Sequence, residues 1–401
     1  MDIGKEAFLT RAVRAFGEAK ALLIEYATGT GKTRAALECA RGARSLAIIV
    51  AEKNHVDKVW KAEMDKWDIH FEEVHFMHAS HIKPIAVDIV IWDEAHMITE
   101  KRAEAYRKIA KDKAVFLSAS MRQERMMLLM EVEPDIKVVS ATLKDAAKAG
   151  AIHMPIIYPV AIDTLDVPGT YAVRIARTYR VWKTVNTWDK SMGDKPVMVK
   201  GPFLPVADAL DRAIQYFSVV RKNGDMAKIL GTKRKLMYTK AKCAFLRDHL
   251  PQVLATRAGK SIIWGSDKSN FGTLFQGKLK FTDYAFHSKL PAAVKRRNMR
   301  AFMEGDLPFL YVVNLMVTGI TPPPTCNAFL VINATYSSTV RLVQQIGRAT
   351  RRAGNMVFAF YLKNMKKEEE WIAKLSKLAH CHEPITVQEA VSLLAQGDDG
   401  A

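Results

Sequence analysis

Short, nearly unbroken runs of apolar residues recur along the first half of the chain, and each one ends in a small group of polar residues. The runs cover residues 21–24, 45–50, 87–92 and 114–117. Runs of this length are typical of parallel strands that are buried on both faces of a sheet. A helical spacing of apolar residues over residues 1–20 predicts a helix before the first strand. The alternation of strands and helices predicts an α/β unit built on a parallel sheet.

The second half of the chain repeats this pattern. Apolar runs at residues 261–264 and 309–313 predict two more buried strands, and residues 291–303 and 368–378 are expected to be helical. The pattern weakens after residue 160, where proline, glycine and clustered basic residues interrupt it. We therefore expect four parts, namely a first lobe at 1–160, a connecting insert at 161–235, a second lobe at 236–385 and a C-terminal tail at 386–401.

The composition is that of a globular protein. Of the 401 residues, 49% are hydrophobic, which is enough for sizeable cores. No stretch approaches the roughly 20 apolar residues that span a bilayer, and the first residues lack the apolar centre of a signal peptide. We expect a cytoplasmic protein, or one in the host cytoplasm if a phage encodes it, and no membrane partner.

The four cysteines lie far apart in the sequence, at positions 39, 243, 326 and 381. They form no Cys-x-x-Cys pair, so they indicate neither a disulfide framework nor a zinc site. The triplet His380-Cys381-His382 has no zinc-binding spacing and is more typical of a surface turn.

The formal net charge of +18 and the pI of about 9.6 favour a polyanionic partner. Lys and Arg gain affinity for nucleic acids because they displace the counterions of the phosphate backbone. The charge by itself does not separate DNA from RNA or from an acidic membrane surface.

Two stretches in and after the insert are rich in basic residues. Between residues 171 and 190, basic residues alternate with aromatic ones, including Trp182 and Trp188, and such a surface can stack single-stranded nucleic acid. An element with an aromatic core side and a basic outer side explains this pattern equally well. The second stretch, at residues 233–242, is more typical of a solvated helix face.

A glycine-containing loop follows the first apolar run and precedes a helix-forming stretch. Its glycines allow the backbone to approach an anion, and the following helix would point its N-terminal N–H groups at that anion. Lys32 would reach the outer phosphates of a nucleotide, and the Thr33 hydroxyl would bind Mg²⁺. A strict phosphate-loop pattern has glycine where Tyr26 stands. The candidate ATP-binding residues of the loop are Thr28, Gly29, Thr30, Gly31, Lys32 and Thr33.

Two adjacent carboxylates, Asp93 and Glu94, follow the third apolar run. ATP hydrolysis needs such a pair, because one carboxylate orients Mg²⁺ and the other positions the water that attacks the γ-phosphate. We assign Asp93 to the metal, together with Thr33, and Glu94 to the water.

These motifs and their order resemble those of superfamily 2 helicases. Residues 27–33 look like motif I, the Asp-Glu-Ala-His of residues 93–96 looks like a DEAH-type motif II, and the Ser-Ala-Ser of residues 118–120 looks like motif III. The Gln-Gln-Ile-Gly-Arg-Ala-Thr-Arg of residues 344–351 looks like motif VI. The resemblance implies two RecA-like parallel-sheet lobes in tandem, with ATP and Mg²⁺ as cofactors in the cleft between them.

The resemblance also implies roles for individual residues. Arg348 and Arg351 are three positions apart on a predicted helix, so they would share a face and stabilise charge on the phosphates as catalytic residues. Gln344 would join the ATP-binding residues, and Ser118 and Ser120 would couple the nucleotide site to the other lobe. The predicted nucleic-acid contacts are Lys53, for which a solvated lysine is an equal alternative, Ser266, Thr318, Gly319, Trp182 and Trp188.

The sequence favours DNA over RNA as the partner. Residues 318–321 and the compact two-lobe length look most like phage UvsW-type helicases, a group that remodels branched DNA. An adenine-reading glutamine, common in superfamily 2, is absent, and Leu9 stands near its expected place. We therefore expect an ATP-dependent DNA helicase or translocase. An RNA helicase of the same fold and a non-hydrolysing nucleic-acid clamp are the alternatives, and the sequence indicates no oligomeric state.

Overall fold

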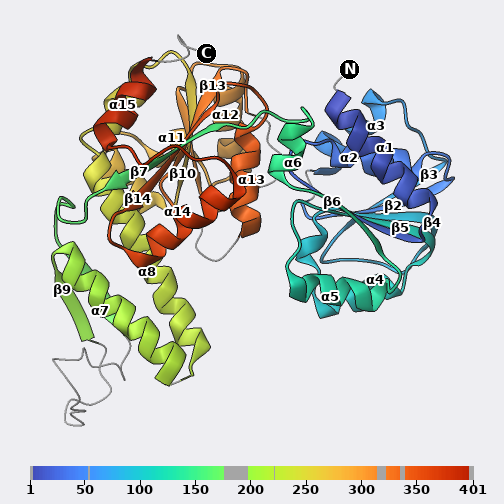
Figure 1. The fold of residues 1–401 in the computed structure, drawn as a ribbon, viewed down its shortest axis with the longest axis horizontal. Helices are drawn as coiled ribbons and strands as arrows, with labels where there is room; N and C mark the ends of the chain where they lie inside the picture. The colour runs from blue at the N-terminus through green and yellow to red at the C-terminus, as the bar shows by residue number, and fades with distance from the viewer. Residues whose placement is uncertain are drawn as a thin grey trace.

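The computed structural model describes residues 3–52, 55–175, 197–220, 222–313, 322–334 and 339–396. Over these residues the chain forms two separate six-stranded sheets, which are parallel throughout, and a two-stranded antiparallel sheet (Figure 1). The predicted α/β fold with two parallel-sheet lobes is confirmed. None of the helices in these ranges is long and apolar enough to span a membrane.

The first lobe is built around a sheet with the strand order β3-β2-β4-β5-β1-β6. Its strands are β1 (Ala21–Tyr26), β2 (Ser45–Val50), β3 (Glu73–His78), β4 (Ala86–Trp92), β5 (Ala110–Ser118) and β6 (Lys137–Ala141). Figure 1 shows α1, α2 and α3 on one face of this sheet and α4 and α5 on the other. The helices are α1 (Ile3–Gly17), α2 (Lys32–Ala40), η1 (Val56–Lys61), α3 (Ala62–Lys66), η2 (Ala95–Met97), α4 (Glu100–Arg107), α5 (Gln123–Val132) and α6 (Leu143–Lys148).

Strand β1 has apolar side chains on both faces of the first sheet, and each face is covered. Leu22 and Ile24 belong to the apolar core on one face, whereas Ala21 and Leu23 belong to the core on the other. All four are buried, because successive side chains of a strand point to opposite faces of the sheet. This burial on both faces accounts for the apolar runs in the sequence.

The second lobe is built around a sheet with the strand order β11-β12-β10-β13-β14-β7. Its strands are β7 (Ile156–Ile162), β10 (Lys260–Gly265), β11 (Ala285–Phe286), β12 (Phe309–Val313), β13 (Cys326–Val331) and β14 (Met356–Leu362). Its helices are α8 (Gly224–Leu246), α9 (Leu250–Thr256), α10 (Lys268–Leu274), α11 (Phe281–Tyr284), α12 (Ala292–Met303), α13 (Thr339–Ala349), α14 (Lys366–Leu378) and α15 (Val387–Gln396).

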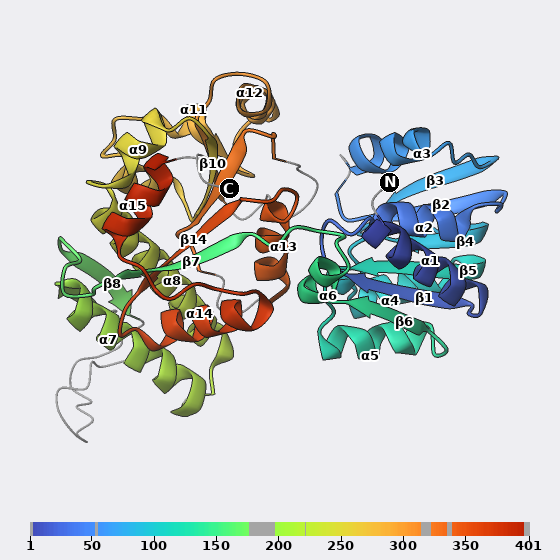
Figure 2. The ribbon, with the colours of Figure 1, turned by 45° about the horizontal axis from the view of Figure 1, so that its top comes forward.

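Strand β7 links the two lobes. After α6 the chain leaves the first lobe, crosses to the second and pairs along the whole of β7 with β14 (Figure 2). The second sheet therefore starts at Ile156, inside the range 1–160 that we expected for the first lobe. An apolar run does not reveal which sheet it will join, so the sequence pattern could not predict that β7 pairs with β14 of the second lobe.

The predicted insert adds a small α/β unit to the second lobe, at the lower left of Figure 1. It contains β8 (Tyr171–Ile175), β9 (Val197–Gly201), α7 (Phe203–Gln215), η4 (Tyr216–Val220) and the first half of α8. Tyr171 and Phe203 are buried in the same apolar core as one face of the second sheet. Tyr171, the first aromatic residue of the basic and aromatic stretch, is thus a core residue, whereas Trp182 and Trp188 lie outside the described residues.

The basic stretch at residues 233–242 is not a uniformly solvated helix face, so that prediction was wrong in part. Lys242 is completely buried, and its Nζ donates hydrogen bonds to the Glu368 carboxylate at 2.9 Å and to the Phe360 carbonyl at 3.1 Å. Arg234 is partly buried and donates to the Asp211 carboxylate at 2.7 Å. Both partners come from other helices, which the local charge pattern does not reveal.

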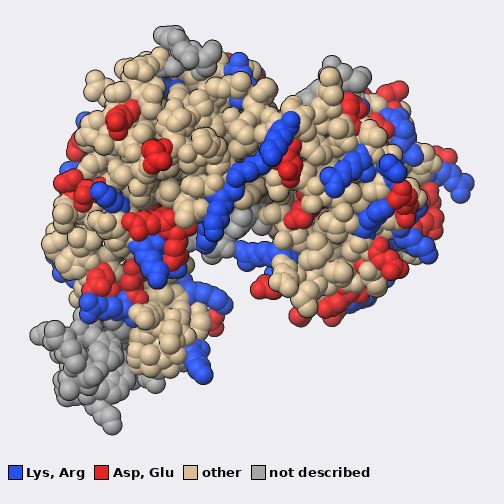
Figure 3. Space-filling view, in the orientation of Figure 1, with Lys and Arg blue, Asp and Glu red and all other residues tan. Residues whose placement is uncertain are grey.

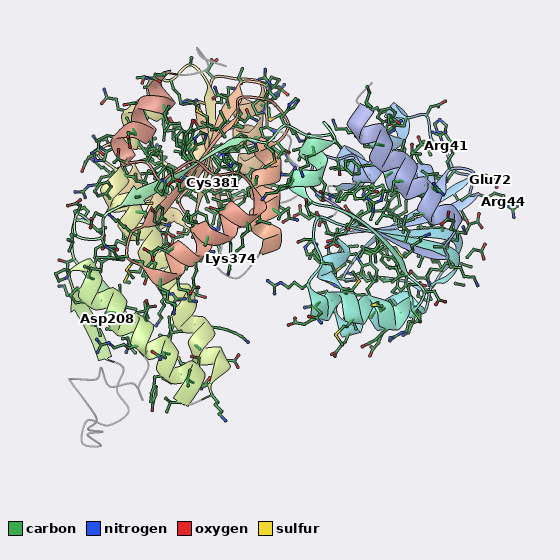
Figure 4. The ribbon with its side chains drawn as sticks, in the orientation of Figure 1. Arg41, Arg44, Glu72, Asp208, Lys374 and Cys381 are labelled. Carbon is green, nitrogen blue, oxygen red and sulfur yellow. The ribbon has the colours of Figure 1, made fainter. Side chains whose placement is uncertain are left out.

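The C-terminal segment covers the edge of the second sheet. Cys381, labelled in Figure 4, forms a parallel bridge with Ile157 of β7, and the His382 ring stacks on Tyr158 with 4.8 Å between ring centroids. The triplet at residues 380–382 therefore runs along β7 and is not an isolated turn. Helix α15, within the predicted tail, packs against β7 and α9 and belongs to the second lobe.

Candidate active site

The loop between β1 and α2 has the geometry of a phosphate cradle. Gly29 and Gly31 have φ angles of 94° and 87°, a region that residues with a side chain rarely adopt. Gly31 is the N-cap of α2, and the first N–H groups of that helix together with its dipole favour an anion at this point. Thr30 is buried, and its hydroxyl donates to the Ala27 carbonyl at 2.8 Å, which braces the loop.

Tyr26 belongs to the core and not to the cradle. Its hydroxyl donates to the Phe8 carbonyl of α1 at 3.2 Å, and the two rings lie 5.1 Å apart between centroids. Burial raises the pKa of Tyr26 to about 12, so its hydroxyl remains a donor at neutral pH. The position that is glycine in a strict phosphate-loop pattern here carries the last core side chain of β1.

Lys32 is the first residue of α2 and lies among carboxylates. Its Nζ donates to the Tyr26 carbonyl at 2.8 Å and to the Ala27 carbonyl at 3.2 Å. Burial lowers the pKa of Lys32, and the negative charges of Glu94 and Asp93 oppose that shift. The lysine of the loop and the two carboxylates that follow β4 therefore act on one another in a single site.

Glu94 is held in a strained backbone conformation. Its φ of 51° and ψ of 50° place a residue with a side chain in the left-handed region, which costs roughly 1–3 kcal/mol and is common at functional sites. Burial raises the pKa of Glu94, but the hydrogen bond with His96 and the charges of Lys32 and Arg348 outweigh it, so the net shift is downward. Glu94 is thus a carboxylate at neutral pH.

A short polar chain leads from Glu94 to the end of β5. His96 Nδ1 lies 3.1 Å from Glu94 Oε2 and 3.4 Å from Ser118 Oγ. Ser118 is fully buried and donates to the Ser120 carbonyl at 2.7 Å. Ser118 is therefore linked to Glu94 through His96, and Ser120 is linked to Ser118. The sequence pattern included His96 in the DEAH-type motif, but we assigned it no role.

Helix α13 brings residues of the second lobe to this site. Gln344 Nε2 donates to Glu94 Oε1 at 3.5 Å, across the boundary between the lobes. Arg348 is buried, and desolvation with the neighbouring Arg351 lowers its pKa to about 10, against the attraction of Glu94. Arg348 still carries its positive charge at neutral pH, so the fold brings together Lys32, Glu94, Gln344 and Arg348.

Arg351 lies beyond the end of the helix that carries Arg348, whereas we expected both residues on one helix. Helix α13 ends at Ala349, whose carbonyl accepts a hydrogen bond from Asn355 Nδ2 at 2.8 Å. The Thr350 hydroxyl donates to the Gly347 carbonyl at 3.0 Å. These two bonds satisfy carbonyls of the last turn and end the helix, because its final carbonyls lack intrahelical donors. Arg351 follows in a turn, with an exposed side chain.

Of the predicted nucleic-acid contacts, Ser266 is the one that lies within the described residues. Ser266 follows β10 and is buried, with its hydroxyl accepting a hydrogen bond from Asn270 Nδ2. The other predicted contacts lie outside the described residues, namely Lys53, Thr318, Gly319, Trp182 and Trp188.

His55 is a buried neighbour of the site that we did not predict. It precedes η1, and its Nδ1 lies 3.6 Å from Asp93 Oδ2, while its Nε2 lies 3.9 Å from Glu52 Oε2. Burial lowers the pKa of His55, but Asp93 and Glu52 outweigh it, and the net shift is upward. A histidine directly after the polar end of β2 was the only signal in the sequence, and its closeness to Asp93 depends on the pairing of β2 with β4.

The site has the chemistry to hold a nucleotide with Mg²⁺. Thr33, in the first turn of α2, supplies a hydroxyl, and Asp93 supplies a carboxylate, which are the oxygen ligands that Mg²⁺ prefers. Mg²⁺ is usually held by one or two protein groups together with substrate phosphates. The described part of the chain contains no group of three or more His, Cys, Asp or Glu that could hold a metal ion.

Comparison with known proteins identifies one protein family that part of the chain matches. Residues 241–353 match the family model of the helicase conserved C-terminal domain. Among curated protein sequences, none matches the chain.

Solved structures resemble most of the chain in fold. Dbp5 from S. cerevisiae, bound to RNA and ADP BeF3, has a TM-score of 0.56 at 13% identity, over 97% of this chain and 92% of that one. The Hef helicase domain from Pyrococcus furiosus has a TM-score of 0.51 at 13% identity, over 93% and 98%. A fragment assigned to the HsdR subunit of a type I restriction enzyme from Vibrio vulnificus YJ016 has a TM-score of 0.59 at 15% identity, over 95% and 68%.

At these identities the likeness concerns the fold. The chain has the tandem RecA-like lobes of helicase structures, and residues 241–353 of its second lobe match the helicase conserved C-terminal domain.

Proposed function

We propose that the protein is an ATP-dependent helicase or translocase of superfamily 2, which hydrolyses ATP between its lobes to unwind or remodel duplex or branched DNA. The observation that carries this proposal is the contact between Gln344 of α13 and Glu94 of the first lobe, at 3.5 Å. It joins residues 250 positions apart at the point where Lys32 and Arg348 also act on Glu94. A site divided between two lobes can be opened and closed, which a site within one lobe cannot.

Each side chain of the site has a role in this proposal. The loop glycines and the N-terminus of α2 receive the phosphates, with Lys32 at the outer ones. Thr33 and Asp93 would hold Mg²⁺, which supplies charge neutralisation of the phosphates when bound. Glu94, as a carboxylate, orients the attacking water and accepts its proton.

The second lobe contributes positive charge. The Arg348 guanidinium, buried at the lobe boundary, stabilises the charge that develops on the transferred phosphoryl group. Such arginines accelerate phosphoryl transfer by a factor on the order of 10³ to 10⁵. Arg351 reaches the nucleotide from the turn after α13 in this proposal. Nucleotide binding and release then close and open the two lobes, which moves nucleic-acid contacts on each lobe relative to one another.

The charge distribution supports a nucleic-acid partner. Figure 3 shows Lys and Arg side chains gathered in a band that crosses the face where the two lobes meet. Helices α6 and α14, which border this region in Figure 1, carry the exposed lysines Lys144, Lys148, Lys374 and Lys377. Such a surface binds phosphate backbones of either DNA or RNA.

We propose DNA and not RNA as the nucleic acid on which the protein acts. Leu9, in place of an adenine-reading glutamine, and the likeness of residues 318–321 to UvsW-type helicases favour DNA. An RNA helicase is the second candidate, because Dbp5, whose fold is similar, has RNA bound in its solved structure. A non-hydrolysing clamp is disfavoured by the ionised Glu94 beside Lys32 and Arg348.

An ATPase assay with matched polyanions tests the proposal. Hydrolysis is measured with single-stranded, duplex and branched DNA and with RNA of the same sequences. We expect stimulation by DNA, greatest with branched DNA, and loss of stimulated hydrolysis in Lys32→Ala. Hydrolysis that Lys32→Ala retains would overturn the assignment of the site, stimulation by RNA alone would make the protein an RNA helicase, and no turnover with any polyanion would support the clamp.

A further inference from the structure

The imidazole of His55 lies between two carboxylates beside the candidate active site. Its Nδ1 is 3.6 Å from Asp93 Oδ2, and its Nε2 is 3.9 Å from Glu52 Oε2. The side chain of His55 is 6% exposed and that of Asp93 is 17% exposed, so both are largely shielded from water. Neither ring nitrogen makes a hydrogen bond with any described residue, and each has a carboxylate oxygen within 3.9 Å.

A buried ring in this position is not explained by packing alone. Burying a polar group without a hydrogen bond is unfavourable, and an apolar side chain of similar size would avoid that cost. The polar contact with Asp93, at 3.6 Å between Nδ1 and Oδ2, offsets this cost. A histidine at this position therefore stabilises the structure only through its contacts with Asp93 and Glu52.

The end of β2 fixes the backbone of Asp93 as well. The Asp93 N–H donates to the Ile49 carbonyl at 2.9 Å. His55 comes from the segment that follows β2, so one element holds both the main chain and the side chain of Asp93. One oxygen of that side chain, Oδ2, is turned to the imidazole.

We propose that His55 is a positioning residue for Asp93, whose carboxylate it holds through Oδ2 in an orientation that would favour binding of the Mg²⁺ of the nucleotide. This inference rests on the proposed function, which assigns Mg²⁺ to Asp93. His55 itself touches neither metal nor nucleotide. Partners that orient a metal ligand in this way contribute to metal affinity, and their loss typically weakens it by about 10- to 100-fold.

The test measures nucleotide binding and not turnover. The affinity of a fluorescent ATP analogue is determined with excess Mg²⁺ and again with EDTA, and the ratio of the two affinities gives the gain due to Mg²⁺. We expect His55→Leu to reduce this gain by about 10-fold or more while affinity in EDTA is unchanged. We expect His55→Asn to retain most of the gain, because its amide can donate to Asp93 from nearly the position of Nδ1.

A double-mutant cycle shows whether His55 acts through Asp93. Asp93→Asn should itself abolish most of the gain due to Mg²⁺, and adding His55→Leu to Asp93→Asn should cause no further loss. The control is His249→Leu, because His249 is a partly buried histidine of the second lobe. It should leave both affinities as in the unmodified protein.

Three results would overturn the inference. The first is a full gain due to Mg²⁺ in His55→Leu. The second is an equal loss of affinity with and without Mg²⁺, which would indicate a purely structural role for His55. The third is a further loss in the Asp93→Asn background. Failure of the unmodified protein to bind the nucleotide at all would instead remove the proposed function.

Discussion

Gly347 of α13 lies so close to Thr28 of the nucleotide loop that a Cβ added to Gly347 would stand 2.6 Å from the Thr28 Cβ. The two residues belong to different lobes, so the contact sets how closely the lobes approach. We predict that Gly347→Ala folds normally, because alanine favours a helix over glycine, yet loses ATPase activity by a factor on the order of 100, since displacements of about 1 Å can have effects of this size.

The control for this prediction is Gly231→Ala in α8, where an added Cβ meets nothing within 4 Å. Steady-state ATPase rates and thermal unfolding of both variants are compared with the unmodified protein. An unchanged rate in Gly347→Ala would mean that the active arrangement of the lobes differs from this contact.

Glu94→Gln separates binding from hydrolysis. The amide cannot accept the proton of the attacking water, so we predict that kcat falls by roughly 10²- to 10⁴-fold. Nucleotide binding should persist, because the cradle residues and Lys32 are unchanged. Rapid-quench measurement of one turnover, beside an equilibrium binding assay, checks both parts. The matched control is Glu100→Gln, an exposed carboxylate at the start of α4. A variant that hydrolyses ATP normally would remove Glu94 from the mechanism.

The buried Lys242–Glu368 pair provides a test of stability away from the site. Both side chains are completely inaccessible, and the Nζ–Oε2 distance is 2.9 Å. Lys242→Met removes the cationic partner of the buried Glu368, so we predict a loss of about 3–5 kcal/mol in the free energy of unfolding, measured with urea. Adding Glu368→Gln should recover part of that loss. Lys228→Met, in an exposed pair, should change little. Equal stabilities of the first variant and this control would contradict the burial of Lys242.

The cysteines should differ in reactivity towards a thiol reagent at neutral pH. Burial raises the pKa of the Cys39, Cys243 and Cys326 thiols to about 12, and it also raises that of Cys381, which is only partly buried. Since the thiolate is the reactive form, these shifts slow the reaction of the folded protein. We predict slow labelling of at most one thiol in the native state, its loss in Cys381→Ser, and labelling of all four after unfolding. Rapid native labelling of several thiols would contradict this prediction.

The sequence predicted those parts of the site that depend only on neighbouring residues, namely the glycine loop and the two carboxylates after β4. The positive φ of Gly29 and Gly31 follows from a tight turn between a strand and a helix, and short-range sequence carries that information. Asp93 and Glu94 were placed after the correct strand for the same reason. The parallel sheets followed from the apolar runs.

Long-range pairings could not be predicted in this way. The partner of Lys242 is 126 residues away, and His55 meets Asp93 only after β2 and β4 have paired. The end of α13 depends on Asn355, which follows the motif and captures the Ala349 carbonyl. Together with the bond from the Thr350 hydroxyl to the Gly347 carbonyl, this hydrogen bond satisfies the last turn of the helix, beyond which Arg351 lies.

The crossing of β7 has a consequence for how the protein is made. During synthesis the first sheet can form as soon as its own strands have emerged, whereas β7 must wait for roughly 200 further residues before β14 can pair with it. Until then β7 is an apolar strand with open edges, of the kind that invites aggregation. A fragment ending after α6 should therefore be soluble on expression, and one ending after β7 should require a chaperone.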